Sequence, residues 1–161
     1  MPVSLYRVSI PPFISYMKNI SACLAKGQAH ASNDEEALAS ARLIGDMGNL
    51  VFQIQRISDT AKGVAQRMGK ATPVAFEDNE KTFPDMQARL TKTIEFLEKL
   101  EPTCMDGMED HEVVMGERKL KGTDYILNYA VPNFYFHVAM AYAIMRKEGV
   151  QIGKKSYLSG A

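Results

Sequence analysis

The sequence has no tryptophan, only two cysteines and no excess of charge of either sign. Nineteen basic residues balance nineteen acidic ones, which argues against nucleic acid or an anionic membrane as the main partner. No apolar run approaches the roughly 18 residues that a membrane-spanning helix needs, and no secretory signal is evident. Cys23 and Cys104 show no metal-binding spacing. We therefore expect a cytoplasmic protein with free thiols, no membrane partner and no nucleic-acid partner.

The overall composition is that of an ordinary globular protein, with 46% apolar and 24% charged residues. A length of 161 residues predicts one domain, residues 1–161, with a sizeable core. The ten methionines are expected to fill gaps in that core rather than to bind metal.

Four long segments carry apolar residues at helical spacing, and residues that end helices separate them. The four helices are expected from Pro11 to about Gly27, from about Asp46 to Gly69, from Thr82 to Leu100 and from Thr123 to Gly149. Thr82 and Asp85 have the spacing of a variant capping box. The pattern predicts an all-α fold, an antiparallel four-helix bundle.

The segment between the third and fourth helices departs from helical spacing. Residues His111–Met115 and Arg118–Lys121 flank Gly116-Glu117, which predicts a small β-hairpin that must lie against the bundle or a partner. This long third-to-fourth link is also where a crossover between helices is expected.

Two polar residues lie on an apolar stripe of the fourth helix. Asn133 and His137 are four residues apart, so they lie on one helix face together with Phe134. Polar groups in such a setting need partners, and Gln53 on the second helix is expected to border the same interior. His137 can be a ligand or general base, or a core histidine bonded to a neighbouring helix. Pro132 either kinks this helix or starts it.

Two carboxylates complete the candidates. Asp46 is an N-cap of the second helix or a ligand, and Asp59 forms a surface ion-pair trio with Arg56 and Lys62 or takes an active role. There is no Ser–His–acid pattern, no phosphate-binding glycine loop and no Glu-x-x-His pair of the di-iron type.

These residues resemble a known group. Asn133-x-x-x-His137 followed by Met145-Arg146 and Gly149 resembles the last helix of DinB-like (YfiT-like) bundles. The chain is most similar to a branch of unknown function within that superfamily. The residues that carry this likeness, between Ser4 and Leu158, are Asp46-Met47, Gln53, Asp59-Thr60-Ala61-Lys62, Phe76-Glu77-Asp78, Pro132-Asn133-Phe134-Tyr135-Phe136-His137 and Gly153-Lys154.

The resemblance implies an antiparallel four-helix bundle, often a homodimer, in a superfamily that includes metal-dependent thiol transferases. Their zinc or nickel is held by three histidines, one on the second helix and two on the fourth. In this chain only His137 matches one of these three histidines. Asn133 lies where the other histidine of the fourth helix is expected, and Gln53 lies where the histidine of the second helix is expected. One imidazole with two amides binds zinc poorly, which predicts a lost metal centre and a buried polar pocket that serves a small ligand or simply specifies the packing.

Two further hypotheses remain. A divalent metal, zinc or nickel, on His137 with Asp46 or Asp59 would make the protein a thiol-transferase-like transferase or hydrolase. Alternatively, the hairpin and apolar helix faces would make it an interaction module that dimerises.

Overall fold

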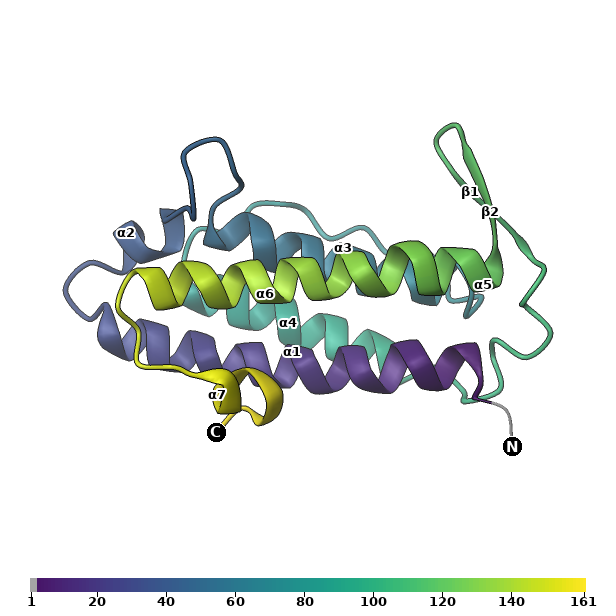
Figure 1. Ribbon diagram of the computed structural model, residues 1–161, viewed down its shortest axis with the longest axis horizontal. Coiled ribbons are helices and arrows are strands. Elements are labelled where there is room, and N and C mark those ends of the chain that lie inside the picture. Colours follow the sequence, from purple (N-terminus) through teal and green to yellow (C-terminus); the bar gives the residue numbers. More distant parts are fainter. Residues whose placement is uncertain (1–2) are drawn as a thin grey trace.

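Four long helices lie alongside one another in the computed structural model, which describes residues 3–161 (Figure 1). They are α1 (Leu5–His30), α3 (Leu50–Arg67), α4 (Phe83–Leu97) and α6 (Val131–Lys147). Shorter elements are α2 (Glu35–Ser40), β1 (Glu112–Met115), β2 (Arg118–Lys121), α5 (Gly122–Asp124), the π-helical η1 (Tyr125–Ala130) and α7 (Lys154–Ser159). The fold is thus mostly helical with a small antiparallel hairpin, as expected, but it has more helices than the four predicted. Within residues 3–161, no helix is both long and apolar enough to cross a membrane.

Helices α1 and α4 run in opposite directions, and so do α3 and α6. Helices α1 and α6 are parallel to each other, and so are α3 and α4. Phe13 stacks on Phe134 at a centroid distance of 4.0 Å, and further along both helices Gly27 packs against Met145, so α1 and α6 run the same way. The antiparallel arrangement expected from the sequence therefore holds for only some neighbours.

The parallel pair α3 and α4 requires a crossover, which residues 70–81 supply; we call them the crossover segment. Going forward along it, Val74 O accepts from Lys62 Nζ at 3.3 Å, and Glu80 Oε2 accepts from Gln55 Nε2 at 3.0 Å. The segment therefore runs back toward the start of α3. The prediction that the crossover lies in the third-to-fourth link was wrong, because the hairpin connects α4 to α5 at one end of the bundle (Figure 1).

Helix starts follow capping and burial. Ser4 caps α1 by accepting from Arg7 N, so the predicted start at Pro11 was wrong and both prolines lie inside the helix. Burial of Leu5 and Ile10 stabilises the helix that begins at this earlier position. At the other predicted starts, α3 begins at Leu50 behind the cap Asn49, and the Thr82 capping box of α4 is confirmed.

The proline in the last long helix lies next to a wide turn. Val131 N–H donates to Ile126 O, five residues back, and the backbone stays helical through Ala130. Because Pro132 has no N–H, the π-helical turn absorbs the lost α-helical bond without breaking the helix. Of the two alternatives, Pro132 does not start a separate helix, because helical backbone precedes it through Ala130.

The hairpin forms where the sequence predicts it and packs on the bundle through its buried Val113, with the partly buried Met115 and Leu120 also against the core. Val113 faces Leu120 in the register and is 2% exposed, and Gly116 at the turn has φ +59°. A two-stranded hairpin needs such an apolar anchor to be stable.

Candidate functional site

The α3–α6 interface, near the start of α3, holds the predicted pair Gln53 and His137. His137 Nδ1 and Gln53 Oε1 are 2.8 Å apart, and Gln53 Nε2 donates to Gly48 O at 2.9 Å. Because Oε1 of an amide only accepts, Nδ1 carries the proton, and the second ring nitrogen, Nε2, is an acceptor. Gln53, only 2% exposed, is thus held at both ends of its amide and fixes the tautomer of the imidazole.

The imidazole is neutral at physiological pH. Burial, helped by the positive charge of Arg56, lowers the pKa of His137 to about 4. Two partly exposed aromatic rings, Phe52 and Phe136, meet the imidazole edge-on at centroid distances of 6.2 and 5.2 Å. The site therefore presents a neutral acceptor nitrogen, His137 Nε2, which lies near the positive charge of Arg56 and is bordered by aromatic rings.

Asn133 lies one turn earlier on α6 and has different partners. Its Nδ2 donates to Thr60 Oγ1 at 2.8 Å, and that hydroxyl in turn donates to Arg56 O at 2.7 Å. The three predicted polar residues, together with Thr60, thus form two separate pairs across the interface, Gln53–His137 and Thr60–Asn133.

The two predicted carboxylates lie in different places. Asp46 is exposed in the loop before α3, and the capping role belongs to Asn49, whose side chain accepts from Phe52 N at 2.9 Å. Asp59 does pair with Arg56 and Lys62, at 2.9 and 3.4 Å.

Arg89 on α4, which sequence reasoning missed, is the centre of an ion network. It is fully buried, and its guanidinium donates to Ser58 Oγ, Glu77 O, Glu80 Oε1 and Asp59 Oδ1 at 2.8–2.9 Å. A signal was present in the sequence, because Arg89 falls between apolar residues of the buried face of α4, where a charge requires partners. These bonds fasten the crossover segment to α3 and α4.

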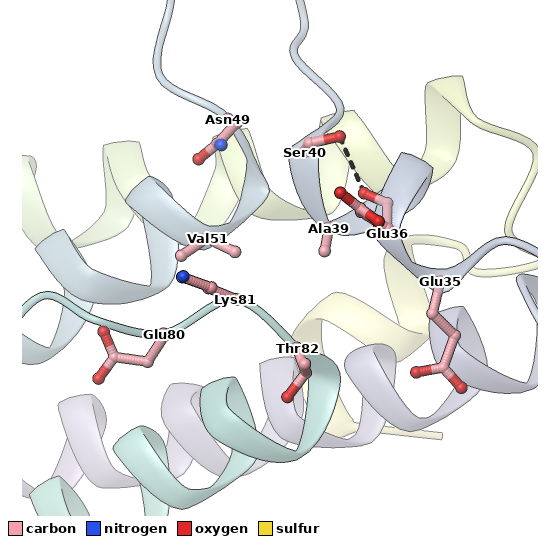
Figure 2. Close-up of a pocket in the computed structure, with 9 residues that line it drawn as sticks. All are labelled: Glu35, Glu36, Ala39, Ser40, Asn49, Val51, Glu80, Lys81 and Thr82. Carbon is pink, nitrogen blue, oxygen red and sulfur yellow. Dashed lines mark hydrogen bonds between the residues drawn. The ribbon is translucent and has the colours of Figure 1, made fainter.

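A cavity of about 560 Å³ lies at the start of α3, between α2 and the end of the crossover segment (Figure 2). Asn49, Val51 and Glu80 are among its lining residues, whereas Gln53, Asn133 and His137 are not. Glu80 connects this cavity to the network, since Arg89 and Gln55 hold its two oxygens.

Comparison with known proteins identifies a similar solved structure and a matching family. A crystal structure described as a DinB family member from Shewanella denitrificans is similar over 96% of this chain and 92% of that chain, with a TM-score of 0.91 and 30% sequence identity. The fold is therefore that of a DinB-like helical bundle. A family model described as a domain of unknown function, DUF1993, matches residues 5–158, and the chain belongs to that family. No protein of curated function matches the chain.

Proposed function

We propose that this protein is a DinB-like bundle whose metal centre is degenerate and which holds a small neutral or anionic ligand at the α3–α6 interface. The observation that supports this proposal is that Gln53, which stands where a second-helix ligand is expected, is bonded at both ends of its amide, by His137 Nδ1 and by Gly48 O. Burial is the main cause that disfavours a proton on His137, and the positive charge of Arg56, which adds to it, also disfavours a divalent cation there.

The donor set also fits zinc poorly. A zinc site needs three nitrogen, sulfur or carboxylate ligands, and His137 Nε2 is one nitrogen. The carbonyl oxygen of Gln53, the amide atom that could bind a metal, already accepts from His137 Nδ1, and Asp59 accepts from Arg89.

Two protein groups, one acceptor and one donor, indicate the chemistry of the ligand. His137 Nε2 accepts a hydrogen bond, and the Nε of Arg56 is a buried donor without a partner within residues 3–161. Because a buried donor without a partner is costly, a ligand acceptor there would stabilise the site. A hydroxyl or thiol, which both donates and accepts, matches both groups.

Metal content of untagged protein tests this proposal, measured by mass spectrometry before and after dialysis against zinc and nickel. We expect no stoichiometric metal in the wild type or in His137→Ala, and the exposed His111→Ala serves as a control for surface binding. One tightly bound metal per chain that is lost in His137→Ala alone would overturn it.

The alternative is a divalent-metal-dependent transferase or hydrolase, thiol-transferase-like, that uses His137. One observation favours it: an Nδ1–H donated to an amide carbonyl is the usual orientation of a metal-binding histidine, with Nε2 left for the ion. The same metal measurement separates the two proposals, since only this one requires stoichiometric metal.

We also propose that the protein is a homodimer whose interface includes Phe52 and Phe136. These rings are 40% and 49% exposed, and they lie on neighbouring helices on either side of His137. Adjacent exposed aromatic rings favour burial against a partner. Sedimentation velocity should show a dimer that Phe136→Glu converts to a monomer, while Leu158→Glu on α7, also exposed, leaves it intact. A monomeric wild type would refute this.

A further inference from the structure

A second cavity, of about 520 Å³, lies at the opposite end of α3, where the crossover segment begins. Its apolar wall comes from both sides of the opening: Ala71 and Val74 from the crossover segment, Phe96 and Leu100 from α4 and the turn after it. Val74 is 37% exposed, so apolar surface of this wall is in contact with solvent. A cavity of this size is in the range that holds small organic ligands.

The floor of this cavity is tightly built. A Cβ on Gly69 would meet Ala65 O at 2.8 Å and Leu100 Cδ2 at 3.1 Å, so the chain passes close to the turn after α4 here. The thiol of Cys104, which is partly exposed, also lines the cavity.

Two lysines supply the charge of the cavity. Lys70 and Lys99 both line it, and neither takes part in any ion pair found within residues 3–161. The only acidic residue of the lining is Glu101, so the charges leave an excess of one positive charge. Burial raises the pKa of the Cys104 thiol, the carboxylates of Asp106 and Glu101 raise it further, and the positive charge of Lys70 opposes this rise.

Lys70 has an unusual backbone for its residue type. Its φ of +56° is in the left-handed region, and it follows the end of α3, where glycine is the preferred residue. The bond from Ala71 N to Ala65 O, at 3.1 Å, holds the chain in this helix-ending turn. A lysine is therefore present at a position whose backbone favours glycine.

We propose that this cavity binds a small amphipathic carboxylate, whose apolar chain lies against Phe96, Leu100 and Val74 and whose carboxylate pairs with Lys70 and Lys99. Charge selects an anion over an amine of the same length. Apolar burial makes binding depend on chain length, with each added methylene tightening it about fourfold.

Protection of Cys104 from alkylation tests this, because the thiol lies in the cavity wall. Cys23 is fully buried and stays unmodified in folded protein, so mass spectrometry reports a single reactive thiol and also confirms the fold. Octanoate should slow the reaction of N-ethylmaleimide with Cys104 in a saturable way, hexanoate should do so more weakly, and octylamine or octanol should not at the same concentrations.

Two variants separate binding from folding. Lys70→Gly removes the charge but suits the positive φ, so we expect an equal or higher melting temperature together with at least several-fold weaker octanoate protection. Lys99→Glu should also weaken protection, whereas Lys155→Glu on α7 should not. Any one of three results would overturn the proposal. Octanoate fails to protect Cys104 in the wild type, octylamine protects it equally well, or octanoate protection is unchanged in Lys70→Gly and Lys99→Glu.

Discussion

Replacing Arg89 by methionine is the most informative perturbation of this fold. The substitution keeps the length of the buried side chain but removes every donor to Ser58, Glu77, Glu80 and Asp59. The partners differ in what they lose. The Asp59 side chain is 36% exposed and can be rehydrated, whereas the Glu80 side chain is 4% exposed and would be left as a buried charge.

The magnitude follows from that difference. Removing one partner of a buried charge pair costs about 3–5 kcal/mol, because the remaining charge is uncompensated. A domain of this kind is stable by roughly 5–15 kcal/mol, so Arg89→Met should remove a large part of the unfolding free energy. With a urea m-value of about 2 kcal/mol/M, the unfolding midpoint should fall by roughly 1.5–2.5 M.

The assay is urea unfolding followed by circular dichroism, with Lys92→Met as the matched control. Lys92 is exposed one turn further along α4, with its ammonium 4.4 Å from the ring centre of Phe76, a contact worth about 1 kcal/mol or less. Arg89→Met combined with Glu80→Gln should recover part of the loss, because Glu80 is then no longer left as an uncompensated buried charge. A midpoint for Arg89→Met as close to wild type as that of Lys92→Met would refute the reasoning.

The other predictions concern protonation and the α3–α6 interface. The pKa of His137 is about 4 against an ordinary 6.5, so its contribution to stability is present above pH 6.5 and is lost as the pH falls toward 4; His137→Gln should remove this part of the pH dependence in chemical unfolding. Imidazole nitrogen shifts in NMR should show the proton on Nδ1 throughout the neutral range. Burial opposes ionisation of Glu80, but bonds from Gln55 and Arg89 outweigh it and hold its pKa below 4.5, so the stability that this carboxylate contributes should be lost below that pH, and Glu80→Gln should flatten the acid limb. Gln53→Ala leaves Gly48 O and His137 Nδ1 without their partner and should cost about 1–3 kcal/mol in the unfolding free energy, more than the exposed Gln151→Ala.

Local patterns predicted the helical elements and the hairpin well. The Thr82 capping box and the Gly116 turn are decided within a few residues, so sequence alone located them. The start of α1 was misplaced because Pro11-Pro12 favours a helix start locally, whereas burial of Leu5 and Ile10 is a tertiary effect. In the same way, the crossover was misplaced because nothing local indicates which two helices are parallel.

The candidate site was predicted in part for the same reason. Spacing on α6 and α3 indicated that His137 and Gln53 face the interior, and they do meet. The pairing of Asn133 with Thr60 depends on the antiparallel register of the two helices, which sequence does not supply. Arg89 was missed because its partners come from α3 and the crossover segment, and a lone arginine on an apolar face does not identify them.

The crossover has a consequence for how this protein folds. In an up-and-down bundle, each helix can pair with the next one along the chain as soon as a short loop closes. Here the antiparallel pairs join distant parts of the sequence, as with Ser21 to Gln87, 66 positions apart, and Gln53 to His137, 84 positions apart. Large loops must close before these contacts form, so the chain should fold more slowly than helical bundles of its size with local connections. The ion network around Arg89 is then assembled only after both parallel helices are in place.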